Sequence, residues 1–225
     1  MKKSEAEILR EYGPFPGVDH VHGVTFDGQH VWIAGGDKLN ALDPASGKML
    51  RSIDVAAKAG TAFDGRYLFQ IAEGQIRKID PQTGSVLATI QAPGHGGDSG
   101  LAWAEGALWV GQHRDRKIHQ VDPETGAILR TIESNRFVTG VTWVDGELWH
   151  GTWEEDASDL RKIDPETGKV LEKLEMPPGV GVSGLESDGG DRFFCGGGAS
   201  GKVRAIRRPR QGSPSSAIPV DAAAK

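Results

Sequence analysis

Hydrophobic and polar residues alternate along this chain in short segments, and two kinds of turn sequence separate the segments. The first is Asp-Gly, as in Asp27-Gly28, and the second is Asp-Pro-x-Thr-Gly, as at residues 164–168. Alternation with a period of two is typical of β-strands, and Asp-Gly is a hairpin turn sequence. The 32 glycines interrupt the chain too often for amphipathic helices. The pattern therefore predicts short strands joined by tight turns.

One unit of this kind recurs five times. It reads Gly-Val-Thr-aromatic, a turn, a second aromatic, a variable loop, and then Asp-Pro-x-Thr-Gly, so each unit holds four strands. The leading glycines are 37 to 44 residues apart, at Gly23, Gly60, Gly100, Gly140 and Gly184. A four-stranded repeat of about 40 residues is typical of a propeller blade.

The repeat predicts an all-β protein: a five-bladed β-propeller with four-stranded antiparallel blades, in one domain over residues 1–210. Its blades start near residues 20, 57, 97, 137 and 181. The fifth unit lacks a fourth strand, and residues 6–12 resemble the fourth strands of the other units. We expect the N-terminal strand to complete the last blade, because this pairing removes two exposed sheet edges. Residues 211–225 are rich in Ser, Pro and Ala and are predicted to be a disordered tail.

Composition and charge narrow the range of partners. A formal net charge of -5 and a pI of about 5.8 argue against nucleic-acid binding. No apolar run reaches transmembrane length, and the first residues lack the apolar core of a secretion signal. The single cysteine, Cys195, is compatible with a reducing compartment. We expect a cytoplasmic protein that contacts no membrane, and the sequence does not indicate its oligomeric state.

Strand polarity predicts a site on one face of the ring, where each first strand starts and each second strand ends. The residues before the leading glycines are His22, Ala59, Ser99, Thr139 and Ser183. They differ between blades while the turns stay uniform, which indicates individual roles. The candidate catalytic residues near this face are His22, His113, Asp98 and Glu73, since histidine and carboxylate side chains suit acid–base chemistry. The candidate ligand-binding residues are Ser99, Thr139, Trp153, Glu154, Ser183, Gln112 and His95.

Two alternatives remain open for these side chains. A divalent metal is a candidate cofactor, held by His22, His95 and His113, although the sequence has no local metal-binding motif. The alternative is that these histidines are solvated or hydrogen-bonded. The charged run of Glu154, Glu155, Asp156 and Asp159 is interpreted as a solvated loop, with Glu154 kept as a candidate, and His150 is expected to pack between blades.

Three segments resemble the glutamine cyclotransferase family of plants and bacteria: residues 21–24 (VHGV), 141–149 (VTWVDGELW) and 163–170 (IDPETGKV). The blade motifs are also similar to those of streptogramin-lyase-like and PQQ-like propellers. The resemblance implies a five-bladed propeller that cyclises N-terminal glutamine in an aromatic-lined axial pocket, with Trp153 as a pocket aromatic. The family's acidic second-blade motif reads Lys58-Ala59-Gly60 here, so its catalytic carboxylate is not preserved.

Together these observations favour an enzyme of the lyase, hydrolase or cyclotransferase kind, acting on a small molecule or short peptide in a His/Asp/Trp-lined axial pocket. The alternative is a propeller scaffold that binds a ligand or a protein without chemistry.

Overall fold

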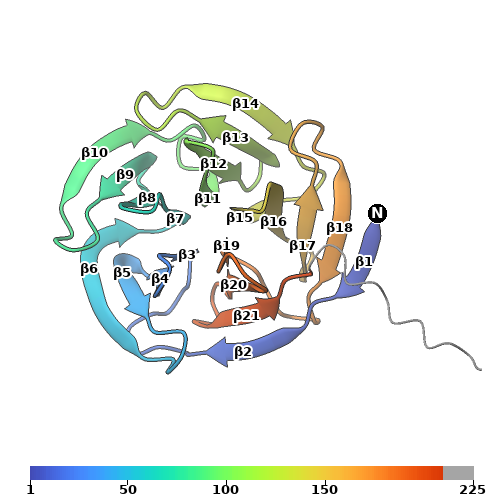
Figure 1. The fold of residues 1–225 in the computed structure, drawn as a ribbon, viewed down its shortest axis with the longest axis horizontal. Coiled ribbons are helices and arrows are strands. Elements are labelled where there is room, and N and C mark those ends of the chain that lie inside the picture. Colours follow the sequence, from blue (N-terminus) through green and yellow to red (C-terminus); the bar gives the residue numbers. More distant parts are fainter. Residues whose placement is uncertain (210–225) are drawn as a thin grey trace, which may run out of the picture.

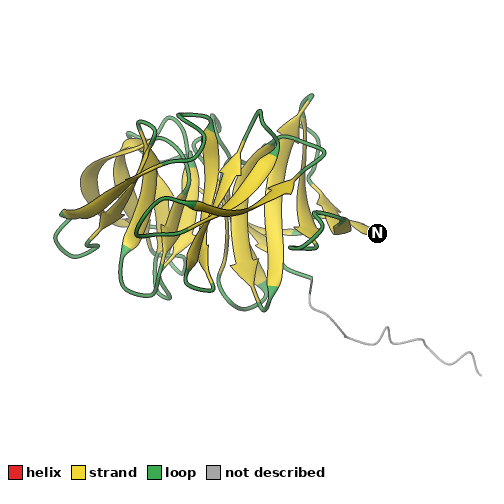
Figure 2. Ribbon diagram, turned by 90° about the horizontal axis from the view of Figure 1, so that it is seen from above, coloured by secondary structure: helices red, strands yellow, loops and turns green. Residues whose placement is uncertain are grey.

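The computed structural model describes residues 1–209 as a ring of five β-sheets around one axis (Figure 1). The all-β, five-bladed prediction is therefore confirmed. The sheets stand side by side, and Figure 2 shows their strands running between two faces that carry the loops. The predicted disordered tail at 211–225 lies outside the described residues. Among the described residues no helix has the length and apolarity needed to cross a bilayer.

Each of the first four blades is built from four consecutive strands. Blade 1 contains β3 (Gly23–Phe26), β4 (Val31–Ala34), β5 (Gly36–Leu42) and β6 (Met49–Ala57). Blade 2 contains β7 (Thr61–Phe63), β8 (Leu68–Ala72), β9 (Gln75–Ile79) and β10 (Val86–Gln91). Blade 3 contains β11 (Asp98–Ala104), β12 (Ala107–Gln112), β13 (Lys117–Val121) and β14 (Ile128–Glu133). Blade 4 contains β15 (Val138–Val144), β16 (Glu147–Glu154), β17 (Ala157–Ile163) and β18 (Val170–Glu175).

Blade 5 joins the two ends of the described chain. It contains β19 (Leu185–Ser187), β20 (Arg192–Gly196) and β21 (Val203–Arg207), and its outer strand is β2 (Ile8–Tyr12), antiparallel to β21. The predicted closure by the N-terminal strand is confirmed. The structure adds a strand that the repeat did not predict, because β1 (Lys2–Glu5) pairs in parallel with the outer edge of β18.

The recurring Asp-Pro turns owe their uniformity to one hydrogen-bond pattern. In the blade 1 turn, the carboxylate of Asp43 accepts the amide of Ala45 at 2.9 Å, and Gly47 donates its amide to the Asp43 carbonyl at 2.7 Å. Gly47 has a φ of 79°, which glycine adopts without steric cost. The equivalent bonds recur from Asp80, Asp122 and Asp164. Turn chemistry therefore explains this half of the repeat.

The hydrophobic core is divided into five clusters, one between each pair of neighbouring blades. The second-strand aromatics fill these clusters: Trp32, Trp109 and Trp149 are fully buried. Trp103 and Trp143, which the repeat also suggested as core, are only half-buried. Trp103 stacks on Phe69 of blade 2, and Trp143 stacks on Trp109 of blade 3. Face-to-face packing of blades is thus the main apolar contribution to stability.

The five leading glycines form a ring around the axis, where the inner strands come closest to one another. A Cβ atom on Gly100 would lie 2.8 Å from the amide nitrogen of Val141, and one on Gly184 would lie 2.7 Å from that of Val24. At the other three leading glycines the approach to the next blade is closer still. The leading glycines recur because only glycine leaves room for the next blade at this position.

Candidate active site

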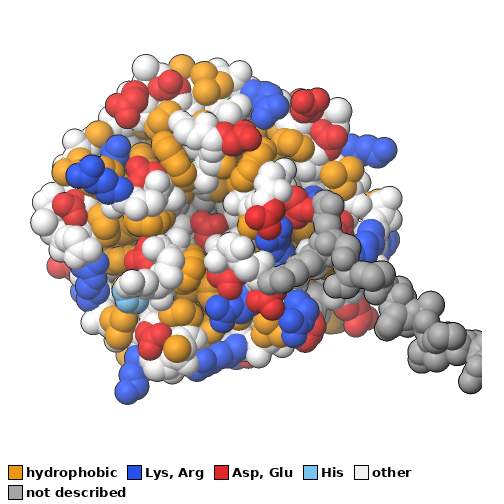
Figure 3. Space-filling model, in the orientation of Figure 1, with side chains coloured by type: hydrophobic (Ala, Val, Ile, Leu, Met, Phe, Trp, Pro, Cys, Tyr) orange, Lys and Arg blue, Asp and Glu red, His pale blue; other side chains and the backbone are white. Residues whose placement is uncertain are grey.

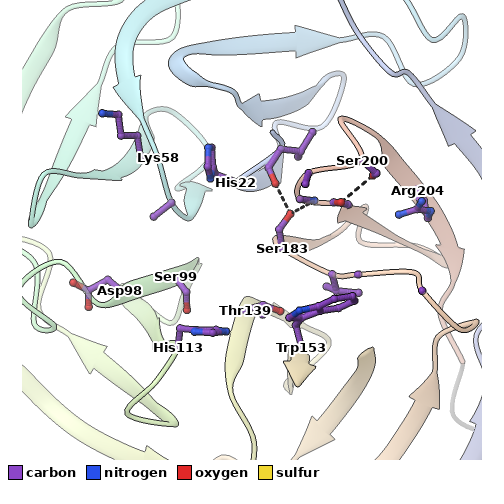
Figure 4. Close-up of a pocket in the computed structure, with 18 residues that line it drawn as sticks. His22, Lys58, Asp98, Ser99, His113, Thr139, Trp153, Ser183, Ser200 and Arg204 are labelled. Atoms are coloured by element: carbon purple, nitrogen blue, oxygen red, sulfur yellow. Dashed lines mark hydrogen bonds between the residues drawn. The ribbon is translucent and has the colours of Figure 1, made fainter. Parts of the chain in front are cut away.

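A cavity of about 560 Å³ opens on the axis at the face where the inner strands begin. Its lining comes from all five blades and from the loops between them, and Figure 4 shows the side chains that surround it. The ring of leading glycines lies deeper along the axis, so the cavity occupies one end of the central channel. A cavity of this size suits a small molecule or a few residues of a peptide.

Seven side chains singled out from the sequence line this cavity together: His22, Asp98, Ser99, His113, Thr139, Trp153 and Ser183. They come from β11, β15 and β16 and from the loops before β3 and β19 and after β12. These residues are far apart in the sequence, but they lie at the same end of the ring because each first strand starts there and each second strand ends there.

Four other candidates do not line the cavity. Glu73 is exposed in a tight turn, where it has a φ of 55° and forms an ion pair of 2.5 Å with Arg77. His95 is exposed in the loop before β11, with a φ of 48°. The structure therefore does not support a role in the cavity for either residue.

Gln112 and Glu154 also contact protein groups instead of the cavity. Gln112 is buried beside Asp98, whose carboxylate it hydrogen-bonds. Glu154 forms ion pairs with Arg116 at 2.5 Å and Arg136 at 3.0 Å. Both side chains are thus engaged by other protein groups, and Glu154 is held more firmly than a solvated loop residue would be.

The serine hydroxyls at the cavity link neighbouring blades. Ser99 donates to the carbonyl of Val138 in blade 4 at 2.7 Å, and Ser183 donates to the carbonyl of Val21 in blade 1. Thr139, at the equivalent place in blade 4, has a buried hydroxyl without a hydrogen-bond partner. The variation at this position therefore has a structural component, because two of the hydroxyl protons are already engaged by backbone oxygens.

The Asp98 carboxylate holds the loop that precedes β11. Both of its oxygens accept the amide of Gly94, at 2.9 and 3.1 Å, and Figure 4 shows the carboxylate directed away from the cavity centre. Burial raises the pKa of Asp98, although the hydrogen bonds from the loop oppose that shift. Asp98 therefore orders the loop and is less available as a catalytic acid than the sequence suggested.

His22 and His113 are the two titratable rings of the cavity, and Figure 4 places them on different sides of it. The ring of His22 stacks on His20 at 5.7 Å between centroids, and His113 contacts Phe137 at 4.8 Å. Burial lowers the pKa of both histidines, and the positive charge of Lys58 adds to the effect at His22. Both rings are therefore neutral at pH 7 and able to accept a proton.

Two basic residues of the lining were missed by the sequence analysis. Lys58 and Arg204 both belong to the cavity lining, and the Nη1 atom of Arg204 is buried without a hydrogen-bond partner. Lys58 occupies the place two residues before a leading glycine, where blades 1, 4 and 5 have valine. That departure from the repeat was the available signal.

Trp153 forms the flat apolar wall of the cavity. The indole lies against the segment before β19, where a Cβ atom on Gly181 would lie 2.9 Å from the ring. Gly181 therefore permits this contact, and the exposed part of the ring remains free for a ligand.

The candidate metal site is not assembled. Among residues 1–209 no three His, Cys, Asp or Glu side chains come close enough to hold an ion. His22 and His113 lie on different sides of the cavity, and His95 lies outside its lining. These three side chains therefore do not fit a divalent metal.

Glu186 lies on the axis below the glycine ring, two residues after Gly184 in β19. It accepts hydrogen bonds from Thr25 of blade 1 at 2.8 Å and Thr142 of blade 4 at 2.5 Å. Burial raises its pKa to about 7. Blades 1 to 5 follow one another clockwise in Figure 1 and anticlockwise in Figure 4, so the two figures view opposite faces of the ring. Figure 3 has the orientation of Figure 1 and therefore shows the face opposite to the cavity, with acidic atoms at the bottom of an axial hollow. The sequence analysis missed Glu186, whose equivalents are Thr25, Ala62, Ala102 and Thr142.

The fold and cavity define a five-bladed propeller with a ligand-sized pocket at one end of its axis. The chain belongs to the family described as Outer membrane protein assembly factor BamB (PQQ_2), whose profile matches residues 72–225. No curated protein sequence matches the chain.

Among solved structures, the chain is similar to glutaminyl cyclase from Myxococcus xanthus, with 19% identity, a TM-score of 0.76, and coverage of 92% of this chain and 97% of that one. It also resembles a chain of a mitotic checkpoint complex, with 12% identity, a TM-score of 0.55, and coverage of 91% and 92%. A third similar chain belongs to Kuenenia stuttgartiensis hydrazine synthase, with 18% identity, a TM-score of 0.50, and coverage of 81% and 56%. At these identities the similarity establishes the fold alone.

Proposed function

We propose that this protein is an enzyme of the lyase, hydrolase or cyclotransferase kind, which acts on a small molecule or a short peptide in the axial cavity. His113 and His22 are its acid–base groups, and Trp153 is the apolar wall against which the substrate packs. The observation that carries the proposal is the pair of half-buried, neutral imidazoles in one ligand-sized cavity.

The chemistry expected of these groups is proton transfer. A histidine whose pKa is lowered by burial is unprotonated at pH 7, so it can remove a proton from a substrate and return it to a leaving group. The similarity to a glutaminyl cyclase adds a candidate reaction, because that protein shares the fold over nearly the whole chain. Asp98, the acidic residue of the lining among the described residues, is directed away from the cavity centre, and this favours the histidines as the proton-transfer groups.

A binding scaffold without chemistry is the second candidate. Two features favour it: Asp98 and the serine hydroxyls are engaged by the backbone, and the family to which the chain belongs is described as an assembly factor. In that case the cavity or the rim around it would bind a ligand or a protein segment.

The experiment is a turnover screen of the purified full chain with N-terminal glutaminyl peptides, esters, lactones and amides, with products identified by mass spectrometry. The variants are His113→Ala, His22→Ala and the control His30→Ala, which alters a histidine near the opposite face. For an active substrate we expect losses of about 100-fold or more in the cavity variants and none in the control. Full turnover in both cavity variants would contradict the proposal, and cavity binding without turnover would favour the scaffold.

We also propose the cytoplasm as the working compartment, because the only cysteine, Cys195, is free and buried. Fractionation of cells that produce the protein, followed by immunoblotting, tests this assignment.

A further inference from the structure

The charged groups around the cavity are unbalanced. Lys58 and Arg204 line it as cations, and within residues 1–209 Asp98 is the only acidic residue of the lining. The Asp98 carboxylate accepts hydrogen bonds from the loop backbone and points away from the centre. The cavity therefore presents more positive than negative charge to a ligand, although the whole chain is acidic.

Neither cation is fully neutralised by the protein. Lys58 has no ion-pair or hydrogen-bond partner among the described residues. Arg204 donates its Nε to Glu11 at 2.7 Å, but Glu11 is shared with Lys202 at 3.0 Å, and the Nη1 of Arg204 has no partner. Two cations thus share one partly exposed carboxylate on that side of the cavity.

Three basic side chains lie together at one side of the cavity. His22 and Lys58 line it, and His20, which is not part of the lining, stacks on His22. Lys58 is close enough to His22 to act on it electrostatically. The repeat places a hydroxyl at the equivalent of His22 in blades 3, 4 and 5, and a valine at the equivalent of Lys58 in blades 1, 4 and 5. Blade packing therefore does not require this basic wall, which consists of His20, His22 and Lys58.

We propose that the ligand of the cavity is a small organic anion, whose carboxylate or phosphate group is held by the basic wall while its apolar part packs on Trp153. This inference rests on the proposed function and names the chemistry of its substrate. His22 then binds the anion in addition to its acid–base role, and His113 lies on another side of the cavity. An N-terminal amine would meet like charge at this wall and is disfavoured.

The anion should change the protonation of His22 in a measurable direction. In the free protein the pKa of His22 is lowered by burial and by the neighbouring His20 and Lys58. A bound anion favours the imidazolium and raises this pKa. The shift belongs to His22 and its wall, so it can be observed without any knowledge of turnover.

The test is a titration of the full-length protein with inorganic phosphate and, separately, with acetate, at constant ionic strength. Nuclear magnetic resonance follows the ring protons of His22 and the indole N–H of Trp153. Lys58→Glu is compared with Lys48→Glu, an exposed lysine at a turn on the other face, so that net charge changes equally. We expect saturable shifts in the wild type and in Lys48→Glu, and affinity at least about tenfold weaker in Lys58→Glu.

A preference for phosphate or for acetate identifies which group the ligand carries. The proposal is overturned if neither anion shifts the two rings beyond a sodium chloride control, or if the two lysine variants respond equally. It is also overturned if a glutaminyl amide, which carries a cationic amine, binds the cavity and the anions do not. That last result would leave the proposed enzyme intact and change only its substrate.

Discussion

Glu186 and Thr25 are joined by a hydrogen bond of 2.8 Å although 161 residues separate them. The bond connects blade 5, in which the ring closes, to blade 1. The other Glu186 oxygen accepts the hydroxyl of Thr142 in blade 4, so one carboxyl group contacts three blades. The equivalent residues of the other blades are threonine or alanine. A carboxyl group at this position is therefore a feature of blade 5.

Glu186 should make the stability of the ring depend on pH. Its pKa is about 7 in the folded protein and near 4.5 in the unfolded chain, so the folded state binds its proton more tightly. The stabilisation is fully present below about pH 4.5 and is lost as the pH rises through about 7. We expect Glu186→Gln to become more stable relative to the wild type by about 1–3 kcal/mol between pH 5 and pH 9.

Urea unfolding of the wild type and Glu186→Gln at several pH values gives this difference directly. Histidines titrate in the same range, but they are common to both proteins and cancel in the comparison. A difference that stays constant with pH would show that Glu186 keeps an ordinary pKa.

His150 should act in the opposite direction. It is fully buried in β16, and burial lowers its pKa to about 4. The folded state excludes the proton that the unfolded chain accepts near pH 6.5, so stability is lost as the pH falls from about 6.5 toward 4. Replacement by the valine found at the equivalent place in blade 3, His150→Val, should reduce the loss between pH 7 and pH 4.5 by about 2 kcal/mol.

Denaturant midpoints of His150→Val and the wild type at these two pH values provide the measurement. Substitution also changes packing, so the pH dependence and not the stability at pH 7 is the relevant quantity. Parallel losses in the two proteins would contradict the expectation.

Substitution in the glycine ring should weaken the contact between blades. Gly100→Ala places a methyl group 2.8 Å from the Val141 amide nitrogen, and backbone atoms of the next blade cannot move aside without opening the ring. We expect a loss of about 3 kcal/mol or more, or failure to fold. Gly97→Ala is the control, because Gly97 is exposed and its nearest neighbour would be 3.3 Å away. Thermal melts followed by circular dichroism compare the two, and equal melting temperatures would be inconsistent with a closed ring at Gly100.

The two N-terminal strands should differ in importance. Removal of residues 1–5 deletes β1 and its Lys2–Glu172 ion pair, which is mostly exposed on the lysine side, so a cost of about 1 kcal/mol is expected. Removal of residues 1–12 also deletes β2, exposes the edge of β21 and empties the buried position of Tyr12. We expect the longer deletion to abolish cooperative unfolding and to cause association through the free edge.

Size-exclusion chromatography and thermal melts of the two deletions test this difference, and a synthetic peptide of residues 1–13 should restore a cooperative transition to the longer one. A cooperative, monomeric protein without residues 1–12 would show that ring closure contributes little.

The repeat in the sequence was sufficient to predict the ring and its closure because backbone chemistry produced the repeat. Residues equivalent to Asp43 and Gly47 recur because the turn between the third and fourth strands needs them. Glycines equivalent to Gly100 recur because the next blade comes too close for a side chain. The strand β1 had no counterpart in the repeat, since it pairs with an outer edge that carries no further strand in the other blades of residues 1–209. Features that belong to a single blade could not be read from a pattern that describes all five.

The same limit applies to the site. Strand polarity indicated which face to examine, and the structure places His22, His113 and Trp153 on one cavity there. Asp98 was read as a free carboxylate because its bonds to the Gly94 amide arise from loop geometry, which sequence spacing does not report. Lys58 and Glu186 were not predicted, because each occurs in a single blade at a position where most other blades carry a residue that serves packing.

Closure by β2 has a consequence for synthesis. β2 is translated long before its partner β21, because β2 ends at Tyr12 and β21 begins at Val203. Throughout the intervening elongation the first strand lacks its final partner, and the growing row of blades carries an unpaired edge at each end. Because such edges associate readily, the period before β21 emerges is when this protein is most exposed to misassembly with other nascent chains.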